Sequence, residues 1–134
     1  MLPRLPASLL SVAKVASVSL ASLALAGCGN TPPSVDSLTL TAPVKGADGN
    51  YSMTATLTVS DADQDKIPRV DLSATGPAVV PTQSLTIPGG AAGTYPIRLT
   101  LAGNAPAGTY TLSAVAYDEP GGASEAKTAT FTLP

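Results

Sequence analysis

Three carboxylates at alternate positions are the residues of this chain best suited to chemistry. They are Asp61, Asp63 and Asp65, in the run Asp-Ala-Asp-Gln-Asp. Side chains at i, i+2 and i+4 of a loop can converge their oxygens on a hard cation, and Ca²⁺ takes about six to eight oxygen ligands. The spacing therefore makes these three residues the candidates for a calcium site, and any affinity is expected in the millimolar range of extracellular modules.

Two known patterns bear on this interpretation. An EF-hand begins with the same spacing but needs glycine and glutamate where this chain has Lys66 and Leu72, so an EF-hand is excluded. The run also resembles the Asp-Ala-Asp-Gly-Asp turns of cadherin-like and other extracellular bacterial modules, some of which bind calcium; here Gln64 replaces the glycine. The alternative is a solvated hairpin loop whose aspartates accept backbone N–H bonds. The candidates for additional calcium ligands are Asp71, Asp118 and Glu119.

Histidine is absent from the sequence, and the only cysteine is Cys28. A Ser-His-Asp or Cys-His catalytic arrangement within the chain is therefore impossible, and so is a histidine-based zinc site. A Ser–Lys dyad stays formally open, but none of the lysines beyond the leader has a recognisable motif partner. Paired carboxylates could hydrolyse a glycoside, yet aromatic residues make up only 4% of the chain, too few to indicate a sugar cleft. We expect no enzyme activity.

The stretch before Cys28 predicts an export signal. A short basic leader precedes an apolar run from Val15 to Ala26 of about 12 residues, shorter than the roughly 20 that cross a bilayer as a helix. Leu-Ala-Gly-Cys at 25–28 resembles the lipobox of bacterial lipoproteins. The resemblance implies a signal peptide over 1–27, its cleavage, and acylation of the Cys28 thiol. Ordinary secretion and an uncleaved anchor are the alternatives.

Lipidation would make the bilayer the first partner of this protein. Bacterial lipoproteins carry two or three acyl chains, and stable anchoring takes two or more. The residue after the cysteine is Gly29 instead of aspartate, which implies a cell-envelope protein of the outer membrane if the source cell has two membranes. Residues 28–34, with Pro32 and Pro33 in succession, predict an extended tether of about 20 Å, at roughly 3.1 Å per residue.

The charge of the mature chain disfavours nucleic acid as a partner. Arg4 and Lys14 would leave with the leader, so five of the seven bases remain against nine acids, a net charge of −4. No cluster of lysine or arginine remains to displace counterions from a phosphate backbone.

The rest of the chain alternates with period two between glycine- and proline-rich turns. This pattern predicts antiparallel strands with one buried and one solvent-facing side, most clearly over 51–60. In the third strand, Pro68 near the start indicates an edge strand or a first residue. The expected strands are 35–42, 51–60, 67–75, 82–87, 94–101, 109–117 and 124–133.

Seven short strands over 35–134 are typical of an all-β, antiparallel Ig-like β-sandwich. Ala-Gly-Thr-Tyr-Thr-Leu at 107–112 resembles the late strands of bacterial Ig-like and fibronectin-type modules. The cysteine pair and core tryptophan of antibody domains are missing, so the resemblance implies the broad superfold. Tyr110 is either a tyrosine corner or a plain core residue. Gly-Thr-Tyr at 93–95 and 108–110 indicates a shared way of starting a strand.

Together these features predict a membrane-anchored cell-envelope lipoprotein whose Ig-like domain is a structural or protein-binding module. Exposed strand edges and loops would supply the contacts. The alternative is a lipoprotein that binds carbohydrate or the cell wall. Sugar binding favours exposed aromatic side chains, for which the candidates near strand ends are Tyr51, Tyr95 and Tyr117.

Overall fold

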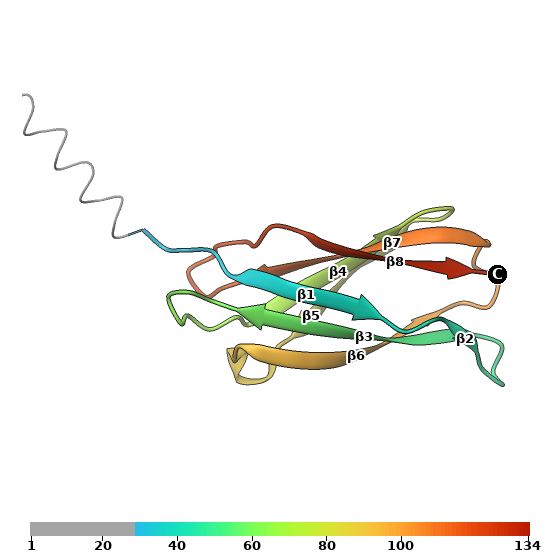
Figure 1. Ribbon diagram of the computed structural model, residues 1–134, viewed down its shortest axis with the longest axis horizontal. Helices are drawn as coiled ribbons and strands as arrows, with labels where there is room; N and C mark the ends of the chain where they lie inside the picture. The colour runs from blue at the N-terminus through green and yellow to red at the C-terminus, as the bar shows by residue number, and fades with distance from the viewer. Residues whose placement is uncertain (1–28) are drawn as a thin grey trace, which may run out of the picture. The chain divides into compact units, whose positions relative to one another are not determined.

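The computed structural model describes residues 29–134 (Figure 1). The predicted signal peptide, its cleavage site and the predicted acylation site Cys28 lie outside the described residues. All strands fall in one compact unit, Thr31–Pro134. They are β1 (Ser34–Leu40), β2 (Val44–Lys45), β3 (Tyr51–Ser60), β4 (Arg69–Thr75), β5 (Val80–Thr86), β6 (Gly93–Leu101), β7 (Gly108–Tyr117) and β8 (Lys127–Leu133), with a 3₁₀ turn, η1 (Pro88–Gly90), between β5 and β6. Within residues 29–134 there is no helix long and apolar enough to span a membrane.

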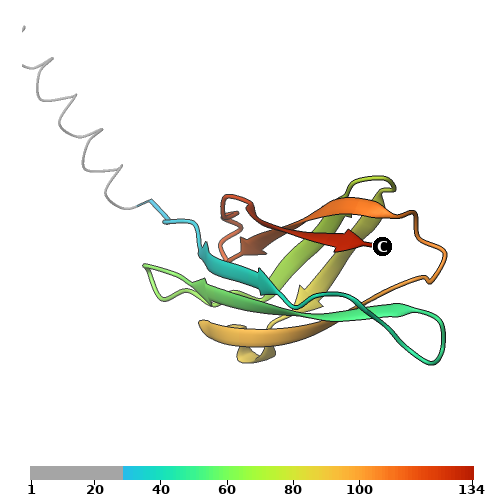
Figure 2. The ribbon, with the colours of Figure 1, turned by 45° about the vertical axis from the view of Figure 1, so that its right-hand side comes forward.

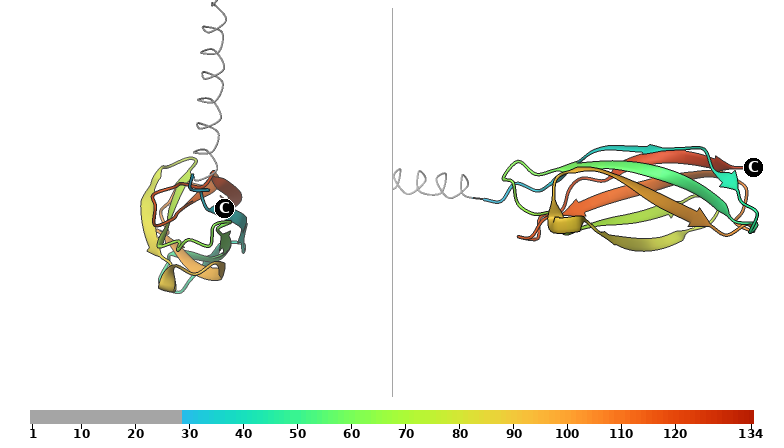
Figure 3. Two further views of the ribbon diagram at one scale, coloured as in Figure 1. Left: turned by 90° about the vertical axis from the view of Figure 1, so that its left-hand side faces the viewer. Right: turned by 90° about the horizontal axis from the view of Figure 1, so that it is seen from below.

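The strands form two antiparallel sheets that pack face to face (Figures 2 and 3). In sheet A, β3 pairs with β6 on one side and with β1 and β2 on the other. Sheet B has the order β5-β4-β7-β8. The predicted antiparallel β-sandwich is confirmed. The short β2 adds an eighth strand because Pro43, which has no N–H to donate, lies between two segments that both pair with β3.

The alternation of β3 explains how the sheets enclose a core. Its odd-numbered residues from Tyr51 to Val59 are buried, while the hydroxyl residues between them are partly exposed. β4 and β7 present the same alternation from sheet B. The core is mostly Val, Leu, Ile and Ala, and each fully buried aliphatic side chain of Val or Leu size contributes about 1.5–3 kcal/mol. The Tyr110 and Phe131 rings stack within it, with centroids 5.2 Å apart.

The structure corrects three expectations about connections. Of the two alternatives for Pro68, the edge strand is wrong, because β4 lies between β5 and β7. Pro68 instead lies at the start of the strand, directly before Arg69, and its carbonyl accepts a hydrogen bond from the Ile87 N–H. The segment 61–66 is not a hairpin, because it links β3 of sheet A to β4 of sheet B. The last strand begins at Lys127 instead of 124, because Ser124 is held in the preceding loop by a bond from its N–H to the Ala116 carbonyl.

The folded unit begins inside the stretch predicted as tether. Pro33 is buried, β1 starts at Ser34, and the Thr31 N–H donates to Asp63 Oδ2 at 2.6 Å. Because Ser34 pairs with Ser60, the chain enters the sandwich at the end that carries the 61–66 segment. We call this the entry end; β8 and the C-terminus finish at the opposite, distal end (Figure 1).

The two Gly-Thr-Tyr segments have the same local structure. Gly93 and Gly108 take positive φ angles of 154° and 135°, which glycine adopts without a Cβ clash. The Tyr110 hydroxyl donates to the Pro106 carbonyl at 2.7 Å, and the Tyr95 hydroxyl donates to the Ala91 carbonyl at 2.5 Å, in each case four residues earlier. Tyr110 is therefore a tyrosine corner, and the repeat is a shared way of starting a strand.

β6 is an edge strand with a proline at its centre. The backbone N–H and C=O of Thr54 bond with Thr41, so the even-numbered residues of β3 direct their backbone groups toward β1 and β2. Thr56 pairs with Pro96, so that pair is not hydrogen-bonded and the Pro96 nitrogen faces the free edge. The free edge of β6 thus lacks one donor that an added strand would need.

Candidate functional site

The acidic turn, Asp61–Lys66, gathers the three carboxylates predicted to bind calcium. One oxygen from each of Asp61, Asp63 and Asp65 lies within 4.8 Å of the others. The turn follows β3 and lies at the entry end, where Thr31 contacts Asp63. The sequence prediction that these residues converge is therefore correct in geometry, while the binding of calcium stays a prediction.

Hydrogen bonds fix the carboxylate of Asp61 at the centre of the turn. Its Oδ1 accepts from the N–H of Asp63 at 2.8 Å and from the N–H of Asp65 at 3.3 Å. Its Oδ2 is buried and has no hydrogen-bond partner. A buried carboxylate oxygen without a donor is costly, and a bound cation would satisfy it. The three carboxylates thus fit a hard cation such as Ca²⁺, which binds through oxygen.

Gln64 occupies the position at which the resembling bacterial turns have glycine. Its φ is +63°, the left-handed conformation, and no other non-glycine residue described in 29–134 has a positive φ. Gln64 therefore takes the left-handed backbone conformation that glycine adopts without a steric cost. A non-glycine residue in this region carries a strain of order 1 kcal/mol or more, which the surrounding bonds must offset.

The electrostatics of the turn favour a cation. Burial raises the pKa of Asp65, and the negative charges of Asp61, Asp63, Asp118 and Glu119 raise it further. Two of the three candidate extra ligands, Asp118 and Glu119, therefore lie close enough to act on the turn. Asp118 is itself buried and accepts a hydrogen bond from the Gly122 N–H.

The third candidate, Asp71, is not brought to the turn. It lies on β4, where its Oδ1 accepts from the Ser84 hydroxyl at 2.6 Å and from Arg69 Nε at 3.2 Å. These bonds and the positive charge of Arg69 lower the pKa of Asp71, against the opposing effect of burial. Asp71 is the ion-pair partner of Arg69, so the calcium hypothesis rests on the other acids.

The tyrosines do not form an aromatic platform for sugar. Tyr51 is buried beneath Lys45, whose Nζ lies 5.2 Å from the ring centroid. Tyr117 is covered by the guanidinium of Arg69 at 3.9 Å. Tyr95 is half-buried and bonded in its own corner. Stacking of a sugar ring on exposed aromatics therefore finds no support among the described residues.

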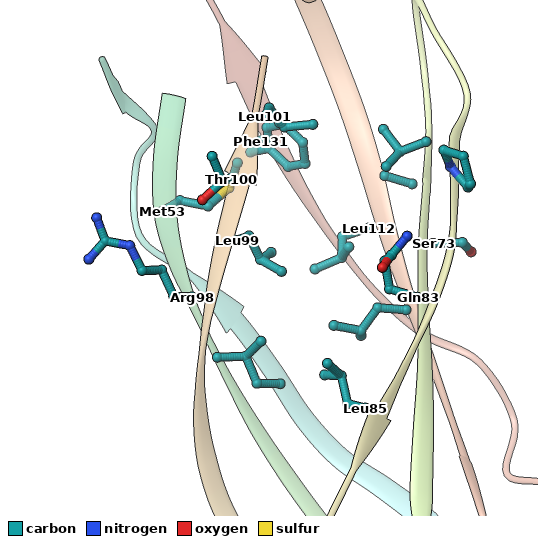
Figure 4. Close-up of a pocket in the computed structure, with 15 residues that line it drawn as sticks. Met53, Ser73, Gln83, Leu85, Arg98, Leu99, Thr100, Leu101, Leu112 and Phe131 are labelled. Carbon is teal, nitrogen blue, oxygen red and sulfur yellow. The ribbon is translucent and has the colours of Figure 1, made fainter. Parts of the chain in front are cut away.

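A space of about 360 Å³ opens between the two sheets on the side flanked by β5 and β6 (Figure 4). Its walls are mostly apolar and include Met53, Leu85, Leu99 and Leu112. On the other side of the sandwich β1 lies beside β8 and closes that side, so within residues 29–134 the sandwich is open between β5 and β6. Alternation in the sequence identified the inward residues of β6, but it did not indicate that this side stays uncovered.

A second hollow, of about 250 Å³, lies on sheet A and was not predicted from the sequence. It is lined by Thr41, Ala42, Val44, Ser52, Met53, Thr54 and Arg98. The only signal for it in the sequence is the period-two series of hydroxyl residues on the outer face of 51–60. The basic side chain that lies beside these hydroxyls, Arg98, is determined by the register of β6 against β3.

No known protein family and no curated protein sequence matches this chain. Among solved structures, the chain is similar to the PKD domain of an M14-like peptidase from a Thermoplasmatales archaeon. The match has 22% sequence identity and a TM-score of 0.50, and it covers 79% of this chain and 99% of that domain. At this identity the likeness defines the fold alone: the chain contains a PKD-like Ig-fold β-sandwich.

Proposed function

We propose that this protein is a non-catalytic cell-envelope lipoprotein, anchored in a bilayer through acylated Cys28, whose PKD-like domain is a structural or protein-binding module. The observation that carries the proposal is a self-contained sandwich entered at Thr31, directly after a lipobox-like sequence. Without histidine, a Ser-His-Asp or Cys-His arrangement within the chain is impossible, and acylation would consume the thiol of Cys28.

The distal end supports the protein-binding role. The large hydrophobic residues exposed in 29–134 are Val44, 63% exposed, and Val79, 76% exposed. Val79 lies at the distal end, in the connection from β4 to β5. Val44, on β2, is also near the distal end, because it pairs with Ser52 at the start of β3. Apolar side chains at the end away from the tether suit contact with a partner protein.

Site-specific photo-crosslinking tests this role in intact cells. A photoreactive side chain at position 79 is expected to give a discrete crosslinked product, and one at Thr58, near the entry end of β3, is expected to give none. A Val79→Asp change combined with a neighbouring probe should abolish the product while the thermal unfolding midpoint stays unchanged. Equal crosslinking from both positions, or none from either, would remove the protein-binding role.

A calcium site at the acidic turn is a second candidate function, favoured by the unpartnered Asp61 Oδ2. Calcium up to about 10 mM, above the weak affinity of extracellular modules, should raise the unfolding temperature of the full chain. Asp63→Ala should remove the shift, whereas Asp71→Asn, which alters an acid away from the turn, should keep it. No shift, or a shift unchanged in Asp63→Ala, would exclude the site.

The raised pKa of Asp65 gives an independent test without metal. Because burial, and then the neighbouring negative charges, raise the folded-state pKa of Asp65 above its unfolded value, the ionised carboxylate destabilises the fold. Stability should therefore rise as pH falls through that pKa. Asp65→Asn should raise the unfolding temperature at pH 7 in chelator and flatten this part of the pH profile. If the variant is less stable than the parent in chelator, the turn is not electrostatically crowded.

A further inference from the structure

The two arginines of the mature domain differ in how their charge is neutralised. Arg69 donates to Asp71 at 3.2 Å and stacks on Tyr117. Arg98, on β6, is exposed and has no ion-pair partner among residues 29–134. Figure 4 shows its side chain pointing away from the apolar side chains between the sheets. The guanidinium therefore lies on the outer side of sheet A, where it is available to a ligand.

The side chains around Arg98 are almost all hydroxyls. Arg98 pairs with Thr54 across the β3–β6 ladder, and Thr100 pairs with Ser52. Thr41, on the other side of β3, accepts the Thr54 N–H on its Oγ1 at 2.9 Å. That bond orients the Thr41 hydroxyl and leaves its proton free to donate. Arg98 and three of these hydroxyl residues line the hollow of about 250 Å³, which we call the Arg98 hollow.

One wall of the Arg98 hollow is apolar. Val44 pairs with Ser52 and therefore lies on the same face of the sheet. It is 63% exposed, and Ala42 beside it also lines the hollow. A patch of aliphatic carbon beside hydroxyl donors matches the two kinds of surface of a sugar ring, whose C–H groups and hydroxyls face different directions.

The charge of the hollow is complementary to an anion. No carboxylate lies among the residues that line it or that pair with Arg98 and its β6 neighbours Pro96 and Thr100. The acids that crowd Asp65 lie instead at the entry end of the sandwich. A domain of net negative charge thus presents an unneutralised guanidinium, the group that binds carboxylates through two parallel hydrogen bonds.

We propose that the Arg98 hollow binds a carboxylated sugar unit of an anionic polysaccharide. Arg98 would hold the carboxylate, the hydroxyls of Thr41, Ser52 and Thr54 would bond the sugar hydroxyls, and Val44 would cover the ring. The site is shallow, so affinity for one unit is weak, and a polymer gains by offering many units. The inference does not depend on the lipid anchor; it gives a ligand class to the carbohydrate-binding alternative.

Binding of the full chain in mild detergent to polygalacturonate tests the proposal. Saturable binding is expected at low salt, and polygalacturonate whose carboxylates are methyl-esterified should bind at least tenfold more weakly, because the backbone is kept and the charge is lost. Arg98→Gln should lower the affinity at least tenfold. Lys127→Gln, which removes one exposed positive charge from β8, should leave the affinity within twofold.

Three results would overturn the proposal. They are no binding to polygalacturonate, equal binding of the esterified polymer, and equal losses in Arg98→Gln and Lys127→Gln, which would indicate a diffuse charge effect. Thr54→Val is a second test, in case Arg98→Gln does not fold. It should reduce binding severalfold while its unfolding temperature stays near that of the parent. A failure here leaves the acylation of Cys28 untouched, because that is measured separately.

Discussion

β6 and β7 begin with the same three residues and end in different environments. Each starts with Gly-Thr-Tyr, has its glycine at positive φ, and bonds its tyrosine hydroxyl to a carbonyl four residues earlier. In β7 the tyrosine, Tyr110, is fully buried, and alternate residues to Ala116 are buried as well. In β6 the inward residues are only half-buried.

Position in the sheet accounts for the difference. β7 lies between β4 and β8 and is covered by sheet A, whereas β6 is the free edge of sheet A and faces the open side of the sandwich. The local sequence determines how a strand starts, and the neighbouring strands determine how much of it is buried. The same change made in both strands should therefore have unequal effects.

Truncation of the two tyrosines should give the largest contrast. Tyr110→Ala removes a fully buried ring that stacks on Phe131 and should cost about 3–5 kcal/mol of unfolding free energy, the usual range for a buried aromatic. Tyr95→Ala should cost less than half as much, because the Tyr95 side chain is only half-buried and its removal exposes less apolar surface to water. Urea unfolding of both variants measures the contrast, and equal losses would contradict a dominant role of sheet position.

Removal of the hydroxyl alone should give a smaller contrast. Tyr110→Phe removes the part-buried hydrogen bond to the Pro106 carbonyl, at a cost of about 1–2 kcal/mol. Tyr95→Phe leaves an exposed carbonyl that water can satisfy, so the cost should be below about 0.5 kcal/mol. If Tyr110→Phe is neutral in the same unfolding measurement, its corner bond does not stabilise the fold.

The smallest effect on stability is expected for a change at Pro96. Because Pro96 lies on the free edge of β6, its replacement should instead promote self-association of the protein through that edge. Pro96→Thr restores an outward N–H and should change the unfolding free energy by no more than about 0.5 kcal/mol. Sedimentation velocity should detect larger species than for the parent at equal concentration, because strand addition is no longer blocked. Pro120→Thr, in an exposed loop, is the control, and an unchanged profile for Pro96→Thr would mean that another feature protects the edge.

The sequence predicted the position of individual strands better than the pairing of strands within the sheets. Strict alternation over 51–60 located β3 without error, since period two has one interpretation when the buried side is continuous. Pro68 was ambiguous because a proline before a central strand and one in an edge strand look alike in sequence; only the pairing of β4 with two neighbours resolves them. The open β5/β6 side and the Arg98 hollow depend on register and on which strands meet, which no local pattern contains.

The acidic turn was predictable for a different reason. Spacing within five residues limits how far Asp61, Asp63 and Asp65 can separate, so their convergence follows from the chain itself. The nearness of Asp118 and Glu119 does not, because it depends on the packing of the β7–β8 connection beside the turn. The left-handed Gln64 was likewise hidden, since its residue type argues against the conformation that it takes.

Mass spectrometry of the N-terminal peptide, from protein extracted from membranes, tests the proposal that this sandwich is a lipid-anchored envelope module. We expect a chain that begins at Cys28 and carries the mass of a diacylglyceryl thioether, with or without a third acyl chain on the new amino group. A Cys28→Ser variant should be recovered from the soluble fraction or retain its leader. An unmodified Cys28 in membrane-extracted protein would show that the sandwich is not anchored by lipid at this residue.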